Sequence, residues 1–246
     1  MDINLKVANV IFSVSNMDED NYRKLGDKKL SILLIKNKNW EVPTVKVESV
    51  CKIDDNIQNF VDKVTNLKNV YSEQLYTFSE VESGQLEITQ TYISLINKTG
   101  LENELNENCK WFDVDLKELE NMYECTLKSG NDKVLFRVSK KLKPQTTDRY
   151  AFSEIGESGL TKNNAVYIIS GFERLKNKIT YTDIVFNMMP KYFTLKNLQQ
   201  VFEAVLNKKL LDPAFRRVIA NKVVATGTYQ KGKGHRPSEL FTYKGK

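Results

Sequence analysis

The chain has 246 residues, a length that suits one large domain or two of modest size. Hydrophobic residues make up 41% and aromatic residues 10%, enough for a sizeable core, so a disordered chain is excluded. No apolar run approaches the roughly 18 residues of a membrane helix, and the N-terminus lacks a small-residue cleavage site, so neither a membrane partner nor a signal peptide is expected.

The cysteines and the one histidine limit the chemistry. Cys51, Cys109 and Cys125 are odd in number and form no CxxC pair, which favours a reduced, cytoplasmic protein with structural thiols. His235 is the only histidine, so clustered-histidine zinc sites are excluded, and so is any histidine triad that does not use it. Because it lies between Gly234 and Arg236, it suits a surface loop.

Charge is unevenly distributed along the chain. Residues 179–246 hold 12 Lys and Arg against 4 Asp and Glu, a net of +8. Residues 1–178 hold 25 against 27, a net of −2, and the two parts sum to +6. A basic C-terminal module on a near-neutral body predicts a polyanionic partner, with nucleic acid as the first candidate.

The first part of the chain has the pattern of an α/β protein. Strands are expected at 30–35, 44–47, 71–78, 86–96 and 111–114, and the SGND stretch predicts a hairpin between 123–127 and 133–138. Asp54 or Asp55 can cap a helix whose apolar positions are Ile57, Phe60, Val61, Val64 and Leu67. A second helix is expected over 161–176.

Beyond Lys178 the pattern changes to short helices and a terminal hairpin. A helix over 181–189 should end before Pro190, and Thr194 should cap a second helix that runs to about Asn207. Asp212 and Pro213 open a third helix to about Lys222, as N-cap and first helical residue. Strands at 223–229 and 239–243 then enclose a basic, glycine-rich loop.

This order of elements is that of a winged helix-turn-helix, with a small helical dimerisation domain as the alternative. Phe215, Val218 and Ile219 form the expected core face of the third helix, which leaves arginine and asparagine side chains to contact bases or phosphates. The hairpin tip adds further cations beside flexible glycines. The predicted DNA contacts are Thr194, Lys196, Arg216, Arg217, Asn221, Lys222, Lys231, Lys233, His235 and Arg236.

A specific resemblance supports this interpretation. The matching motifs are Glu173-Arg174-Leu175, Tyr181-Thr182, Pro190, Phe193-Thr194-Leu195, Leu198-Gln199, Phe215-Arg216-Arg217 and Arg236-Pro237. With these, the C-terminal 70 or so residues resemble the Nudix-related transcriptional regulators, although His235 replaces the usual Gly before Arg-Pro. The resemblance implies that Arg216, Arg217, Lys231, Lys233 and Arg236 carry DNA contacts. It also implies an α/β fold: a Nudix-like α/β/α sandwich with a mixed sheet over 1–178, followed by a winged helix-turn-helix domain over 179–246.

The resemblance further predicts a Nudix box, G-x5-E-x7-R-E-U-x-E-E-x-G-U, in the opening helix. Alignment on Pro43 puts Cys51 at the first Glu, residues 59–64 on the REUxEE stretch and Asn66 at the final Gly. Nudix chemistry needs Mg²⁺ on several carboxylates of this helix, and only Asp62 remains. We therefore expect no catalytic residue, no metal and no cofactor.

A Nudix-like domain without its metal site can still bind an effector. The resemblance implies ADP-ribose, a nucleotide sugar or a sugar phosphate. Aromatic side chains could stack on a base and Lys36 could meet a phosphate, although each aromatic is as consistent with a core position. The candidate ligand-binding residues are Lys36, Trp40, Tyr76, Phe78 and Gln90. The long segment 116–160 is expected to form a lid or a dimer contact.

The sequence thus predicts a cytoplasmic, bacterial transcription regulator that forms a homodimer on palindromic, double-stranded operator DNA. The hinge between its domains is expected near 177–180. Whether it acts as a repressor or an activator stays open. The alternatives are a divergent Nudix pyrophosphohydrolase and a ligand-binding interaction module without DNA binding.

Overall fold

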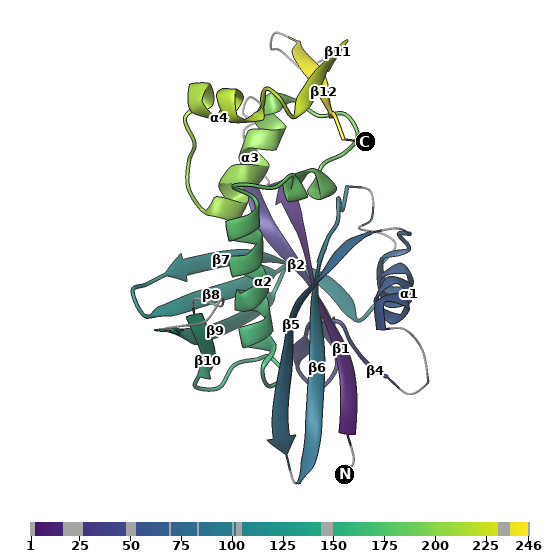
Figure 1. Cartoon of the computed structure of the whole chain (residues 1–246), viewed down its shortest axis with the longest axis vertical. Helices are drawn as coiled ribbons and strands as arrows, with labels where there is room; N and C mark the ends of the chain where they lie inside the picture. The colour runs from purple at the N-terminus through teal and green to yellow at the C-terminus, as the bar shows by residue number, and fades with distance from the viewer. Residues whose placement is uncertain are drawn as a thin grey trace.

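A curled mixed sheet forms the body of the protein in the computed structural model (Figure 1). The structure describes residues 3–16, 27–47, 53–68, 70–82, 84–99, 101, 105–143, 150–230 and 237–245. The strands are β1 (Ile3–Asn16), β2 (Lys28–Lys36), β3 (Trp40–Glu41), β4 (Thr44–Lys46), β5 (Tyr71–Glu82), β6 (Gln85–Leu95), β7 (Cys109–Glu118), β8 (Met122–Ser129), β9 (Asp132–Leu142) and β10 (Tyr150–Ile155). Their order is β10-β9-β8-β7-β2-β1-β6-β5, with β3 beside β2 and β4 beside β1. Strands β1 and β6 run parallel, and the other pairs are antiparallel.

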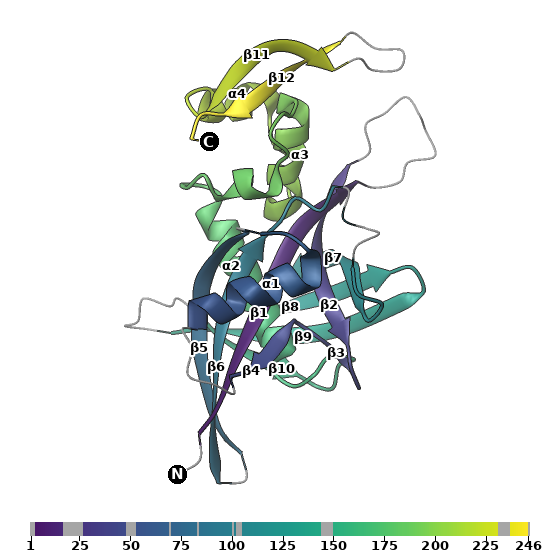
Figure 2. The ribbon, with the colours of Figure 1, turned by 90° about the vertical axis from the view of Figure 1, so that its right-hand side faces the viewer.

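Two helices cover opposite faces of this sheet. Because successive side chains of a strand point to opposite faces, Val10 and Phe12 of β1 face one way and Ile11 faces the other. The first two belong to the core cluster that contains helix α2 (Asn164–Lys178), whereas Ile11 clusters with the buried side chains of helix α1 (Ile53–Thr65). Figure 2 shows α1 lying across the sheet on the side away from α2. The predicted α/β/α sandwich with a mixed sheet is confirmed.

Three strands were not expected from the sequence: β1, the two-residue β3 beside β2, and β10. Strand β1 is the longest, and its buried polar residue Asn9 interrupts the apolar run but donates a 2.9 Å hydrogen bond to Ser94 of β6. Strand β10 pairs with β9 as the edge of the sheet, so the acidic stretch from Ser153 is partly strand rather than only loop. The predicted hairpin between β8 and β9 is confirmed, with Gly130 at φ +55° in its turn.

The C-terminal part begins where α2 ends and lies at the end of the molecule away from the N-terminus (Figure 1). Its elements are the 3₁₀ helix η1 (Ile184–Met188), α3 (Leu195–Leu206), α4 (Asp212–Ile219), β11 (Val223–Gln230) and β12 (Ser238–Tyr243). The helix expected over 181–189 is therefore only a short 3₁₀ helix, and α4 ends at Ile219 rather than near Lys222. None of the described helices is long and apolar enough to span a membrane.

The hydrophobic core continues from the sheet into the C-terminal part. Phe172 and Leu175 of α2, Val185 of η1 and Leu198 of α3 belong to one cluster of buried residues. Helix α3 also packs against β2. The segment near 177–180, where the hinge was expected, therefore joins two parts that share a packed core.

Candidate DNA interface and ligand pockets

Helix α4 presents two arginines on its solvent side. Phe215 and Ile219 are buried in the core cluster, whereas Arg216, Arg217 and Val218 are exposed. At 100° per residue, Arg217 lies almost opposite the midpoint between the two buried residues, and Arg216 lies on the flank. Val218, expected in the core, is 58% exposed because it falls on the other flank. This face is free to meet a partner.

The start of α4 differs from the expected capping. Leu211 is the N-cap residue, Asp212 is the first helical residue and Pro213 stands in the first turn. The Asp212 carboxylate accepts a 2.8 Å hydrogen bond from the side-chain amide of Gln199 in α3. Asp212 thus ties α4 to α3 while its charge still favours the helix N-terminus.

Two of the ten predicted DNA contacts are engaged inside the protein. Thr194 is buried, and its Oγ1 accepts a 3.1 Å hydrogen bond from the Asn197 N–H as the N-cap of α3. Lys222 forms a 2.6 Å ion pair with Asp183, which also accepts a 2.8 Å hydrogen bond from Tyr243. These contacts lower the pKa of Asp183, with Lys222 as the main cause. Thr194 and Lys222 therefore stabilise the fold of the C-terminal part.

The remaining predicted DNA contacts fall into two groups. Lys196 and Asn221 are exposed, like Arg216 and Arg217. Asn221 follows α4 in a turn, four residues after Arg217. Lys231, Lys233, His235 and Arg236, of the loop between β11 and β12, lie outside the described residues.

The hairpin β11–β12 is held beside α3. Phe193, directly before the cap of α3, exchanges backbone hydrogen bonds of 3.0 and 2.8 Å with Phe241. Tyr243 stacks on Phe186 of η1, with ring centroids 4.1 Å apart. Figure 2 shows α4 and the hairpin together at the end of the molecule. A helix with outward arginines beside such a hairpin has the arrangement of a winged helix that can bind duplex DNA.

Helix α1 keeps the apolar positions of the predicted Nudix box. Val61 and Val64 are buried, whereas Asn59 and Lys63 are exposed. Asn66, aligned with the final Gly of the box, has φ +57°, a left-handed conformation that glycine adopts most readily. Within the described part of the chain, no three Asp, Glu, His or Cys side chains gather so that they could hold a metal ion. Cys51, aligned with the first Glu, lies outside the described residues.

The five predicted ligand-binding residues occupy three separate places. Lys36 lies over the buried Trp40 ring, 5.0 Å from its centroid. Tyr76 and Phe78 of β5 contact each other edge to face at 4.9 Å. Tyr76 pairs with Thr91, so Gln90 points to the opposite face of the sheet, where it donates a 3.0 Å hydrogen bond to Tyr92. The structure thus does not bring the five together.

Tyr76 and Phe78 line a pocket of about 640 Å³ over a stripe on one side of α2, which runs from the buried Val166 to the exposed Asn177. The stripe consists of Val166, Ser170, Glu173, Arg174 and Asn177, which recur at helical spacing. Strands β5 and β10 supply the pocket's aromatic walls, and Tyr181 lines it beyond the end of α2. Sequence patterns did not select the polar residues of this stripe, because polar side chains at helical spacing have the composition of an ordinary solvated face.

Two lysines and two carboxylates form a network on one wall of this pocket. The Lys140 and Lys176 ammonium groups each lie 2.5 Å from the Glu118 carboxylate, and Lys176 also lies 3.8 Å from Glu173. Burial alone would raise the pKa of Glu118, but hydrogen bonds from these lysines hold it at about 2. The lysine side chains are thereby fixed in position.

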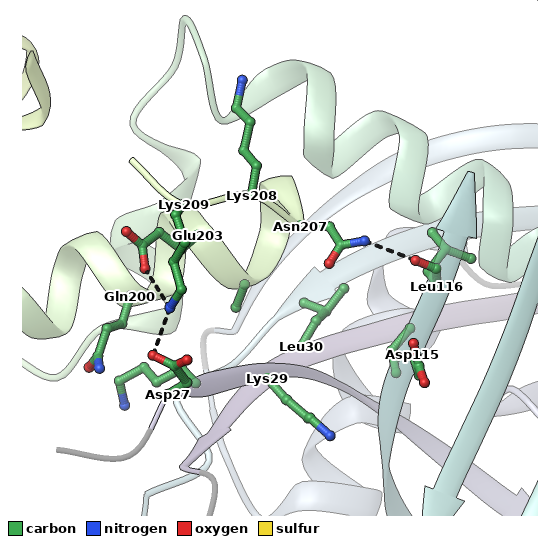
Figure 3. A pocket seen from close by; sticks show the side chains of 13 residues that line it. Asp27, Lys29, Leu30, Asp115, Leu116, Gln200, Glu203, Asn207, Lys208 and Lys209 are labelled. Carbon is green, nitrogen blue, oxygen red and sulfur yellow. Dashed lines mark hydrogen bonds and ion pairs between the residues drawn. The ribbon is translucent and has the colours of Figure 1, made fainter. Parts of the chain in front are cut away.

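A second pocket of about 490 Å³ lies between the sheet and α3 (Figure 3). Lys209 lies 2.7 Å from Asp27, before β2, and 3.3 Å from Glu203 of α3. Asn207, which ends α3 with φ +51°, donates a 2.9 Å side-chain hydrogen bond to the Leu116 carbonyl of β7. These contacts join the body to the C-terminal part across the pocket.

Comparisons with known proteins agree with this geometry. Residues 185–243 match the family described as the NrtR DNA-binding winged helix domain. A curated relative, the ADPR responsive transcriptional repressor NtrR of Acinetobacter baylyi, is 40% identical over 73 residues, which is 29% of this chain and 29% of that protein.

Two solved structures share the whole architecture. Shewanella oneidensis NrtR complexed with a 27mer DNA superposes with a TM-score of 0.67 at 18% identity, covering 98% of this chain and 93% of that one. A MutT/nudix family protein from Enterococcus faecalis gives 0.68 at 18% identity, covering 99% and 87%. The chain therefore has the fold of the Nudix-related transcriptional regulators, a Nudix-like body with a winged helix domain, as the resemblance implied.

Proposed function

We propose that this protein is a cytoplasmic, ligand-responsive transcriptional regulator that binds operator DNA through its winged helix. The observation that carries the proposal is the outward arginine face of α4, in a segment that matches a DNA-binding winged helix family. Arginine can bind guanine edges or phosphates, and the net charge of +8 over 179–246, from 12 basic and 4 acidic residues, attracts a polyanion. We place the boundary between its two domains at 178/179.

The proposed effector is ADP-ribose or a related nucleotide or sugar phosphate. Support comes from the Acinetobacter baylyi relative, whose name describes it as ADPR responsive and as a repressor. By analogy the present protein represses transcription, and its Nudix-like domain releases the winged helix from DNA when the effector binds. An effector can change DNA affinity only through its different affinities for the two states, typically about 1–3 kcal/mol of coupling.

The Nudix-like domain is proposed to be catalytically inactive. The predicted box keeps Asp62 alone among the carboxylates that Mg²⁺ would need, and Lys63 would repel the ion. Incubation of the purified protein with ADP-ribose and Mg²⁺ should give no turnover. Turnover that a chelator abolishes would identify a divergent hydrolase instead.

Fluorescence anisotropy with labelled promoter DNA tests the regulatory proposal. The full-length protein should bind DNA from upstream of its own operon more tightly at 50 mM than at 200 mM salt, because phosphate contacts release counterions. ADP-ribose should weaken that binding, whereas unrelated duplexes should bind far less tightly. Equal affinity for every duplex would reject a specific regulator.

We also propose that the protein acts as a homodimer on a palindromic site. One winged helix covers only a half-site, and two-fold operators are matched by two-fold proteins. Light scattering should give twice the mass of 28.4 kDa at binding concentrations. A monomeric mass for both the free protein and the complex would overturn this part alone.

A further inference from the structure

The pocket over α2 combines aromatic surfaces with an excess of positive charge. Its lining includes Tyr76, Phe78, Tyr150, Phe152 and Tyr181. Its cationic side chains are Lys140, Lys143, Arg174 and Lys176, against the two carboxylates Glu118 and Glu173, a net of +2. Exposed aromatics can stack on a nucleobase, and a charge of +2 complements a diphosphate. A volume of about 640 Å³ suits a small-molecule ligand.

The geometry points to this pocket, and not to the face of the sheet that α1 covers, as the site of an aromatic, anionic effector of the nucleoside diphosphate class. This inference rests on the proposed function, since it locates the effector of that proposal. Tyr76 and Tyr181, 41% and 69% exposed, offer the stacking surfaces. Lys143 is half-buried and pairs with no carboxylate of the described residues, so its ammonium can bind phosphate.

The carboxylates do not oppose an anionic ligand here. Glu118 is bound by both Lys140 and Lys176, and the Tyr123 hydroxyl donates to Glu173. Each ammonium has three N–H donors: Lys140 uses two of them on Glu118 and the Tyr123 hydroxyl, and Lys176 uses two on Glu118 and Glu173. The network therefore holds the lysines in place and leaves donors for the ligand, as a preorganised anion site requires.

The location also connects the ligand to the winged helix. Tyr181 lies in the segment between α2 and η1, and its N–H donates to the Lys178 carbonyl at 3.2 Å. Two residues later, Asp183 holds Lys222, directly before β11, and Tyr243, the last residue of β12. A ligand that holds Tyr181 in place therefore acts two residues from Asp183, whose contacts hold the hairpin β11–β12. Coupling would require the ligand to bind more tightly in one arrangement of the winged helix, and Tyr181 is placed to make that difference.

Isothermal titration of the full-length protein with ADP-ribose, and separately with ADP and ribose 5-phosphate, tests the inference. Tyr181→Ala and Tyr76→Ala should each weaken ADP-ribose binding by about tenfold, because base stacking contributes roughly 1–3 kcal/mol per base. Lys143→Ala should weaken binding of all three probes. Matched controls are Lys141→Ala, an exposed lysine outside the pocket lining, and Gln90→Ala on the opposite face of the sheet.

The possible results distinguish a failure of the proposed pocket from a failure of the proposed function. Weaker binding in the pocket variants, with unchanged binding in the controls and unchanged operator affinity without ligand, supports the assignment. If the pocket variants bind the probes as tightly as the wild type and Gln90→Ala binds them less tightly, the assignment of the effector to this pocket is overturned. The proposed regulatory function is then unaffected. No binding of any probe by the wild type, with operator binding intact, overturns the proposed effector class and the pocket with it.

Discussion

At the scale of single residues, the two arginines of α4 differ in how directly they face solvent. Arg217 lies almost opposite the buried pair Phe215 and Ile219, whereas Arg216 lies on the helix flank. Asn221, in the turn after the helix, follows Arg217 by four residues and therefore lies on the same side. Arg217 is therefore the residue best placed to enter a DNA groove.

We predict that Arg217→Ala weakens operator binding by about 1–3 kcal/mol if the guanidinium contacts a base, and relaxes specificity at one position. If it contacts phosphate instead, affinity falls uniformly across sequences and the salt slope decreases by about one. Anisotropy titrations at several salt concentrations distinguish the two. Arg137→Ala is the control, because Arg137 is ion-paired with Glu124 in the body. Unchanged operator affinity for Arg217→Ala would reject α4 as the DNA-reading element.

Glu118 should make the stability of the body depend on pH. Its pKa in the folded protein is about 2, below the ordinary value of 4.5, so the unfolded chain takes up the proton first as the pH falls. The stability that ionised Glu118 contributes is therefore full above about pH 4.5 and is lost as the pH falls toward 2. The solvent-exposed part of the side chain reduces this contribution by screening.

Urea unfolding at several pH values tests this. Glu118→Gln should be less stable than the wild type at pH 7, and the difference should shrink steadily below about pH 4.5. The exposed Glu120, two positions along, provides the control, since Glu120→Gln should differ little from the wild type across the range. A Glu118→Gln difference that stays constant down to pH 2.5 would contradict the assigned ion pairs.

Local sequence pattern predicted the exposed arginines of α4 but not the pocket over α2, for a physical reason. Arg216 and Arg217 sit between apolar residues at helical spacing, so local periodicity alone turns them outward. Val218 was wrongly expected in the core, because only two of the eight residues of α4, Phe215 and Ile219, are buried. The pocket depends on strands far apart in the chain, β5 and β10, meeting one side of α2, and no local pattern encodes that meeting.

At the scale of elements, capping and turn residues were predictable, whereas long-range strand pairing was not. The Thr194 cap, the β8–β9 hairpin and the buried stripe of α3 follow from local chemistry, and the structure confirms them. Strand β1 was missed because its buried polar residues Asn9 and Ser13 break the apolar pattern. Their partners, Ser94 and the Ile96 carbonyl, lie more than eighty residues away.

Thr194 was expected to contact DNA, but its hydroxyl caps helix α3. We predict that Thr194→Ala lowers the free energy of unfolding by about 1 kcal/mol through loss of the N-cap, while the folded protein keeps its operator affinity. Thr194→Ser should restore most of the stability, since its hydroxyl can accept the same hydrogen bond from Asn197. Chemical unfolding and anisotropy report the two properties separately. A large loss of affinity in a fully folded Thr194→Ala would instead restore Thr194 as a DNA contact.

At the scale of the whole molecule, the winged helix is attached to the body by more than the chain itself. The core cluster runs through α2, η1 and α3, and two polar contacts, Lys209 with Asp27 and Asn207 with Leu116, join the parts at the pocket of Figure 3. The ion pair is solvent-exposed, and such pairs contribute about 0–1 kcal/mol. The Asn207 hydrogen bond is the more directional contact, so it should matter more for where the winged helix sits.

Asn207 allows this contact to be removed without disturbing the end of α3. It has φ +51°, so Asn207→Gly preserves the left-handed conformation and removes only the side-chain bond to the Leu116 carbonyl, worth about 1 kcal/mol. If one of two domain arrangements uses this bond, its loss shifts their equilibrium about fivefold. The ratio of operator affinities with and without ADP-ribose should then change by up to this factor, while the melting temperature falls by only a few degrees. Asn207→Ala is the comparison, since it removes the bond and also strains the backbone, and should lower stability further. A ratio that stays at the wild-type value in Asn207→Gly would show that both arrangements keep this contact, and the coupling would then have to run through the packed core of α2 and η1.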